Sequence, residues 1–290
     1  MALDTKRTYK PIRKLQKSLK SLSKVTSPEE VHDFRTRSRR TQAVLEALGL
    51  DRRSNERRML QDLRKLRKRA GKVRDMDVLT AFTSQLQVDG EADCKVQLLE
   101  HLGTQRSKHA KKMRGLLRKD GSPLLKRLKR SSTRIQKLLQ RAERNGDGTA
   151  STAMAEALRL SSELADPPRL DRRNLHPYRL KVKQLRYVLE MAQDADQAKF
   201  VEQLGEAKDA IGEWHDWEEL IAIAGDVLDH RPGCGLLREL KAISEQKYQR
   251  ALQLTNELRA KYVKGSRAPR GKKSRELARP VLTATSAMAA

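Results

Sequence analysis

Cationic side chains line up along one face of residues 175–192. On a helix that turns about 100° per residue, positions i, i+3, i+7, i+10 and i+14 share an arc of about 80°. Here those positions hold His176, Arg179, Lys183, Arg186 and Glu190. At about 1.5 Å rise per residue, this polar stripe is about 21 Å long. Cations aligned over that length suit a long polyanion better than one small anion, because successive cations could neutralise successive anionic groups.

The same stripe occurs earlier in the chain, at an offset of 144 residues, within residues 31–48. The paired positions are His32 with His176, Arg35 with Arg179, and Arg39 with Lys183. Gln42 stands where the later segment has Arg186, and Arg40 directly follows Arg39. Two such units related by a pseudo-twofold axis would direct both stripes to one cavity. The alternative is a solvated face, although such a face usually interleaves acids with cations at i±4 spacing.

A second repeated element follows each stripe, at an offset of 141 residues. It reads Gly71-Lys72-Val73-Arg74-Asp75 in the first half and Gly212-Glu213-Trp214-His215-Asp216 in the second. We expect each glycine to end one helix and each aspartate to begin the next, where the helix dipole favours a carboxylate. Four residues before the glycines, Arg67 and Lys208 could point into the same cavity or be ordinary surface cations.

The elements that carry these residues are predicted to be helices. Good helix formers fill most positions, whereas aromatic and β-branched residues are sparse. Turn signals at 120–123 and 231–233 separate stretches of apolar periodicity. Helices are expected near residues 8–24, 28–48, 52–70, 73–88, 91–118, 122–144, 151–165, 171–192, 195–211, 214–231 and 234–263.

A soft stretch at residues 145–151 divides the chain near its midpoint, at the boundary between the two repeats. The predicted fold class is therefore all-α, with two helical bundles related by a pseudo-twofold axis and a basic groove between them. The predicted domains are an N-terminal helical extension at 1–27, bundles at 28–144 and 151–263, and a basic disordered tail at 264–290.

The charge of the chain narrows the classes of function. Its 290 residues carry 63 Lys and Arg against 37 Asp and Glu, a formal charge of +26. Such an excess is hard to keep compact unless a polyanion is nearby. It excludes an acidic calcium buffer and disfavours an enzyme built on clustered carboxylates. A binder of nucleic acid, of an anionic membrane surface or of another polyanion stays open.

Metal, cofactor and membrane signals are weak. Neither His32 nor His176 has a second ligand at metal-binding spacing on its own face, so no metal site is predicted. Cys94 and Cys234 form no C-x-x-C pair, and no Walker A loop indicates a nucleotide cofactor. The start of the chain lacks a signal-peptide core, and no run approaches the roughly 20 apolar residues of a membrane span. We expect a cytoplasmic protein without membrane contact.

The ordered set of repeated motifs resembles the CHAD domain, the conserved histidine α-helical domain. Each half opens a helix with H-x-x-R and further basic residues, then continues to the G-x-x-R-D-like element described above. The resemblance covers about residues 28–263, with His215 standing where arginine is usual and with Gln42 and Gln184 in place of basic residues.

The resemblance implies two pseudo-symmetric bundles around a basic central groove that binds inorganic polyphosphate. It also implies a non-catalytic module, often associated with polyphosphate granules in bacterial cells. The contact residues that we predict are His32, Arg35, Arg39, Arg40, His176, Arg179, Lys183 and Arg186, with Arg67 and Lys208 as further candidates. Oligomeric state does not follow from the sequence.

Two rival hypotheses come from other classes. Weak, non-specific nucleic-acid binding fits the charge and the basic tail, but the chain has no zinc module or RNP-type aromatic stretch and few stacking platforms. A polyphosphatase or a histidine phosphotransferase is disfavoured, because the stripes carry only Glu46 and Glu190 as carboxylates for Mg²⁺.

Overall fold

The computed structural model describes residues 5–23, 26–87, 92–145, 148–191, 197–229 and 233–263. Within these ranges the chain forms eight α-helices and no strand, which confirms the all-α prediction. The helices are α1 (Thr5–Leu22), α2 (Pro28–Ala47), α3 (Ser54–Gln85), α4 (Ala92–Asn145), α5 (Gly148–Ala165), α6 (Leu175–Leu189), α7 (Ala198–Val227) and α8 (Gly235–Leu258). A short π-helical segment, Arg259–Val263, continues α8.

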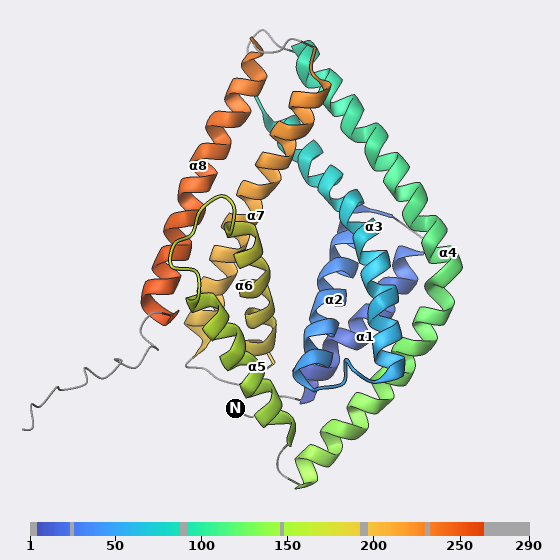
Figure 1. Ribbon diagram of the computed structural model, residues 1–290. Helices are drawn as coiled ribbons and strands as arrows, with labels where there is room; N and C mark the ends of the chain where they lie inside the picture. Colours follow the sequence, from blue (N-terminus) through green and yellow to red (C-terminus); the bar gives the residue numbers. More distant parts are fainter. Residues whose placement is uncertain are drawn as a thin grey trace, which may run out of the picture.

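The helices form two units of four, α1–α4 and α5–α8, that correspond helix by helix (Figure 1). In each unit the last two helices make a long hairpin, and the two hairpins converge at their tips (Figure 1). The second helix of each unit, α2 or α6, lies on the inside, and α2 contacts α6 directly. This is the predicted pseudo-twofold arrangement, and it places both cationic stripes at the centre of the molecule.

Local sequence explains where the inner helices begin and which face they bury. Ser27 caps α2, because its hydroxyl oxygen accepts a hydrogen bond from the Glu30 backbone N–H at 3.2 Å, and Pro28 occupies the first turn. On α6 an apolar stripe lies beside the cationic one and is buried; it consists of Leu175, Tyr178, Val182, Leu185 and Leu189. Burial of these faces turns the adjacent cationic stripes toward the space between the units.

Two apolar cores hold the units together. The larger core includes residues from each of the helices α1 to α8, among them Phe34 and Tyr178. The smaller core lies at the hairpin tips, where Phe82 of α3 stacks on Trp217 of α7 with ring centroids 4.6 Å apart. The tips are therefore joined by packing across the two repeats, not only within each.

Three predicted helix boundaries are wrong. The turn expected at 120–123 lies inside α4, which continues through Pro123. Proline normally disrupts a helix interior, but Leu117 and Leu124 on either side of the expected turn are both buried, so packing along α3 maintains one long helix. The breaks expected at Gly71 and Gly212 are also absent, so Asp75 and Asp216 lie within α3 and α7, not at helix starts.

The predicted disordered tail at 264–290 lies outside the described residues. Among the helices that the structure describes, none has the length and apolar character needed to cross a membrane.

Candidate functional site

A cavity of about 580 Å³ lies between the two units, walled by α2 and α6 and by α3 and α7. Six of the ten predicted contact residues line it: His32, Arg35, Arg39, His176, Arg179 and Lys183. They are the three repeat-equivalent pairs at the start of the two stripes. The helical periodicity of the sequence therefore identified residues that the fold brings together from positions about 140 residues apart.

Each of the two repeated glycines leaves space that the guanidinium group of a repeated arginine fills. A Cβ atom built on Gly71 would lie 2.5 Å from Nη1 of Arg35, and one on Gly212 would lie 2.7 Å from Cζ of Arg179. Each guanidinium thus crosses the bare backbone of the facing helix. Arg35 is 3.6 Å from the Asp75 carboxylate, and Nε of Arg179 donates a hydrogen bond to the Lys208 carbonyl at 3.0 Å. Close approach of arginine, and not helix termination, explains both glycines.

The middle pair of the stripe has no counter-charge. Among the described residues, neither Arg39 nor Lys183 makes a hydrogen bond or an ion pair. Burial, helped by the neighbouring Arg179 and Arg39, lowers the pKa of Lys183 to about 6. Burial likewise lowers the pKa of Arg39, with Arg35 adding to the effect. An anion in the cavity would supply the missing charge and reverse these shifts.

The histidines differ in their surroundings. Burial and the nearby His215 lower the pKa of His176 to about 4, and the two rings lie with centroids 4.0 Å apart. Burial also lowers the pKa of His32, and Arg74 adds to it. The pKa of His215 is raised, chiefly by the neighbouring carboxylate of Asp216. His32 and His176 are therefore neutral hydrogen-bonding groups at neutral pH.

Arg74 and His215 are cavity residues that the sequence analysis did not select as contacts. They are equivalent positions of the repeated G-x-x-R-D-like element, so the repeat itself carried the signal. Arg74 also has no ion-pair partner in the described part of the chain, so it is another cation of the wall without a carboxylate beside it.

The α7 wall is acidic, contrary to a uniformly basic groove. It presents four carboxylates to the cavity, and α3 adds one: Asp209, Glu213, Asp216, Glu219 and Asp75. Three of them have a cation of their own, and the other two share His215. Asp75 faces Arg35, Glu213 is 2.7 Å from Nζ of Lys247, and Asp209 pairs with Lys208. Asp216 and Glu219 each lie 3.9 Å from Nδ1 of His215. The charge left without a partner in the cavity is therefore positive.

His215, Asp216 and Glu219 also bear on the prediction of no metal site. One potential ligand atom of each lies within 4.8 Å of the others, so this trio could hold a cation. His215 and Asp216 belong to the repeated element of the sequence, whereas Glu219 lies outside it, and this grouping was not predicted. Because Asp216 and Glu219 flank a His215 with a raised pKa, we assign the trio to an internal ion pair.

The other four predicted contacts lie outside the lining of this cavity. Glu190 sits between Arg40 and Arg186, at 3.2 Å and 3.0 Å, and so links α2 with α6. Arg67 donates hydrogen bonds to Ser38 and Gln42, and burial lowers its pKa to about 10. The Lys208 ammonium group pairs with Asp209, as described above.

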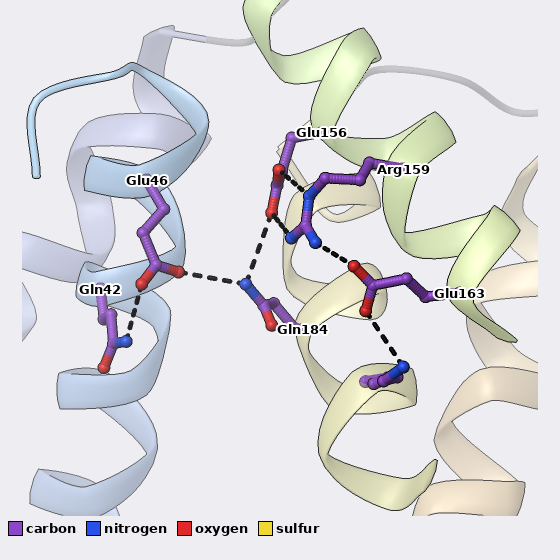
Figure 2. A network of polar contacts seen from close by, with 7 residues as sticks. Gln42, Glu46, Glu156, Arg159, Glu163 and Gln184 are labelled. Carbon is purple, nitrogen blue, oxygen red and sulfur yellow. Dashed lines mark hydrogen bonds and ion pairs between the residues drawn. The ribbon is translucent and has the colours of Figure 1, made fainter.

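A polar network closes the far end of the stripe (Figure 2). Gln42 and Gln184 each donate a hydrogen bond to the Glu46 carboxylate, at 2.8 Å and 3.2 Å. Gln184 also reaches Glu156 of α5 at 3.5 Å, and Glu156 pairs with Arg159. Figure 2 shows this chain crossing from α2 to the second unit. The distal half of the predicted 21 Å stripe thus joins the units, while the proximal half lines the cavity.

Comparison with known proteins gives a family match and similar solved structures. The CHAD domain family model matches residues 9–224. The crystal structure of the CHAD domain from the plant Ricinus communis is similar over 90% of this chain and 93% of that chain, with a TM-score of 0.63 and 19% identity. PptA from Streptomyces chartreusis is similar over 89% and 98%, with a TM-score of 0.63 and 15% identity. No curated protein matches. The family match spans most of the chain, including both cationic stripes, and the protein therefore belongs to the CHAD domain family.

Proposed function

We propose that this protein binds inorganic polyphosphate in the cavity between its two units, without catalysing a reaction. The observation that carries the proposal is the set of cations that face the cavity without a carboxylate partner, Arg39, Arg74, Arg179 and Lys183. Two of them belong to the first unit, on α2 and α3, and two belong to α6 of the second unit. A chain of phosphates can contact them together, whereas a single phosphate reaches only some of them.

Phosphate chemistry suits these groups. Guanidinium groups donate pairs of hydrogen bonds to phosphate oxygens, and neutral histidines can donate one each. Release of counterions from the polymer favours binding at low salt. The carboxylates of the α7 wall lie beside a lysine or His215, and this contact reduces their repulsion of a bound phosphate.

Competition binding tests the proposal. Labelled long-chain polyphosphate is titrated at about 0.15–0.3 M salt, where contacts to DNA phosphates weaken steeply, and is challenged with duplex DNA, RNA and short phosphates. We expect polyphosphate to remain bound. Equal competition by DNA per phosphate would show that the charge acts diffusely and would overturn the proposal.

A double variant locates the site. Arg39→Gln with Lys183→Gln removes two cations of the stripe that make no described hydrogen bond or ion pair, so helicity should be kept while binding falls about 100-fold or more. The matched control is Arg130→Gln with Lys137→Gln on the outer surface. Unchanged affinity in the first variant would remove the cavity from consideration.

A second surface supports nucleic-acid binding as the alternative. A groove of about 540 Å³ on the outside of the first unit is lined by five cations and no acid: Arg53, Arg130, Arg134, Lys137 and Arg141. Only Arg134 has an acidic partner among described residues, at 2.6 Å from Glu56. If DNA binding disappears in the Arg130 and Lys137 variant, or on deletion of 264–290, while polyphosphate binding stays, the two activities use different surfaces.

The absence of catalysis and an association with polyphosphate granules belong to the same proposal. Each carboxylate of the cavity lies beside a cation or a histidine of the protein, which disfavours a Mg²⁺ site for phosphoryl transfer. Incubation with polyphosphate and Mg²⁺ or Mn²⁺ should release no phosphate. Fluorescent fusions of the wild type and of the Arg39 and Lys183 double variant test the granule association directly.

A further inference from the structure

A separate cavity, of about 190 Å³, lies where α1 and α2 meet the end of α6. It shares no lining residue with the central cavity, and we call it the α1 cavity. One part of its wall is apolar and consists of Pro11, Val44, Tyr187 and Met191. The rest is charged and consists of Lys10, Lys14, Arg37, Arg40 and Glu190. A wall divided in this way suits a ligand with one apolar end and one anionic end.

The apolar part of the wall is continuous with the protein core. Val44 and Met191 belong to the larger core and are 2% and 3% exposed, and Tyr187 is 8% exposed. Pro11 lies inside α1, where proline normally interrupts a helix, and its ring gives the wall a rigid apolar edge. An apolar cavity of about 150 Å³ holds one benzene ring, so this cavity has room for a single ring with a substituent. The thioether of Met191 favours an aromatic ring, because sulfur makes favourable contacts with ring edges.

Two cations of the α1 cavity have no carboxylate beside them. Lys10 and Lys14 are exposed and lie one turn apart on α1, so their side chains share a face of the helix. Among the described residues neither lysine makes an ion pair, and the sequence of α1 contains no acid. An anion in the α1 cavity would therefore be attracted most strongly by these two lysines.

The other charged residues of this wall have partners within the protein. Arg37 pairs with Asp33 of its own helix. Glu190 lies 3.2 Å from Arg40 and 3.0 Å from Arg186, so two cations offset the charge of this carboxylate. Nε of Arg40 is buried without a hydrogen-bond partner among the described residues. The charge of the α1 cavity that has no partner is positive, as in the central cavity.

A phosphate monoester of one aromatic ring fits both parts of the wall. Such a monoester carries close to two negative charges at neutral pH, because its second pKa is about 6. Two lysines match this charge, whereas a carboxylate has only one charge to offer them. Inorganic phosphate and polyphosphate have no ring, so they would leave the apolar part of the wall uncovered.

We propose that the α1 cavity binds a free aryl phosphate as a second ligand of the protein. The ring lies against Pro11 and Met191, and the phosphate group contacts Lys10 and Lys14. No cation of the central cavity takes part, so this inference is independent of polyphosphate binding.

Isothermal titration calorimetry on the full-length protein tests the ligand class with phenyl phosphate, inorganic phosphate and phenol at pH 7.5. We expect phenyl phosphate to bind at least about tenfold more tightly than either of the others, because it alone has both the ring and the dianion. Equal affinity for phenyl phosphate and inorganic phosphate would overturn the inference, since the apolar wall would then contribute nothing.

A pair of double variants on α1 tests the position of the phosphate group. Lys10→Gln with Lys14→Gln should weaken phenyl phosphate binding about tenfold or more. The matched control, Lys17→Gln with Lys20→Gln, removes the same charge from exposed positions of the same helix outside the cavity lining. It should leave the affinity within about twofold, because salt screens charges that lie away from the ligand. Equal losses in both double variants would show that the overall charge of α1, and not this cavity, attracts the ligand.

The position of the ring is tested at Pro11. Pro11→Ala favours the helix but removes part of the apolar wall, so the affinity for phenyl phosphate relative to inorganic phosphate should fall about threefold. Circular dichroism confirms that the variant is folded, and an unchanged ratio would overturn the placement of the ring.

The central cavity is the other place where phenyl phosphate could bind. Arg39→Gln with Lys183→Gln removes two cations of that cavity and none of the α1 cavity, so the affinity for phenyl phosphate should be unchanged. Loss of phenyl phosphate binding in this variant would assign the ligand to the central cavity and overturn the inference.

Discussion

Helices α3 and α7 occupy equivalent places in the two units, yet their charges are opposite. α3 carries nine Lys and Arg against four acids, and α7 carries two against eight. Both keep the glycine on which an arginine of the facing helix rests, Gly71 in one and Gly212 in the other. The repeat has therefore retained its packing device while the surrounding charges diverged. Steric fit between arginine and glycine, and not the charge of the helix, is therefore the feature that both units share at this contact.

The outer hairpin helices extend the same asymmetry. α4 carries sixteen Lys and Arg against four acids, whereas α8 carries four against three. Much of the charge excess of the chain thus lies on the outside of the first unit, away from the cavity. The net charge of the chain therefore does not determine the charge around the cavity. Four predictions test whether binding depends on the cavity residues.

The largest expected effect on binding comes from adding a side chain at Gly71 and Gly212, where two arginines pack against the backbone. Gly71→Ala with Gly212→Ala should push both guanidinium groups out of place. Because the end of an arginine side chain can swing away, the stability cost is modest, but loss of two charged contacts should weaken polyphosphate binding about 100-fold or more. Isothermal titration calorimetry measures it.

The control for this prediction lies in α4, where a Cβ atom on Gly103 or Gly115 would meet nothing within 4 Å. Alanine there should leave binding unchanged and stabilise the helix by about 0.5–1 kcal/mol. Binding that survives in the Gly71 and Gly212 variant would show that the seated arginines do not contact the ligand.

A charge exchange on α7 should have the next largest effect. Asp209→Lys with Glu213→Lys gives α7 the residue type that α3 has at the equivalent positions, Lys68 and Lys72. Affinity for polyphosphate should rise about tenfold at 0.15 M salt, and the slope of log K against log salt should steepen by about two. A salt titration measures both. An unchanged slope would mean that the α7 wall lies away from the bound chain.

The pH dependence of binding should be smaller. The pKa of Lys183 is about 6 in the free protein, and a bound polyanion raises it, so binding above pH 6 takes up a proton. Affinity should therefore be constant below pH 6 and fall as pH rises, about fivefold between pH 6 and pH 8. Fluorescence anisotropy at constant salt measures it, and Lys183→Arg should flatten the profile. A profile of the same steepness in that variant would assign the proton to another group.

The smallest effect is expected at the closed end of the stripe. Burial raises the pKa of Glu46, so its charge is already disfavoured, and Glu46→Gln keeps an oxygen that can accept from Gln42 or Gln184. Urea denaturation should show a change within about 1 kcal/mol, with polyphosphate affinity unaltered. A loss of affinity would place the ligand beyond Lys183, in the network of Figure 2.

Sequence periodicity predicted the inner helices and their faces well. The core stripe of α6 and the three cation pairs lie where a helix of 3.6 residues per turn puts them, because both depend only on local spacing. The breaks at Gly71 and Gly212 were wrong, because a glycine that ends a helix and one that receives a side chain from another helix look alike in sequence.

Contacts between the two units determine which of the predicted cations face the cavity, and the sequence alone does not give these contacts. Arg186 belongs to the predicted stripe by spacing and Arg40 directly follows a stripe residue, yet Glu190 lies between them and draws both into the interface. The acidic wall was not predicted, because among the carboxylates of α7 the sequence analysis gave a role only to Asp216, as a residue at a helix start. The effect of its carboxylates on the charge of the cavity depends on the groups that face them, and these are set by how the two units pack.

The stack of Phe82 on Trp217 gives the protein an optical reporter of its own. Phe82 is part of the cavity wall, while Trp217 is nearly buried behind it. The other tryptophan, Trp214, packs against Tyr248 with ring centroids 5.3 Å apart. A ligand that displaces Phe82 changes the environment of one indole more than that of the other. Emission from Trp217 in a Trp214→Phe background would then follow occupancy of the cavity in real time, with no label on either molecule.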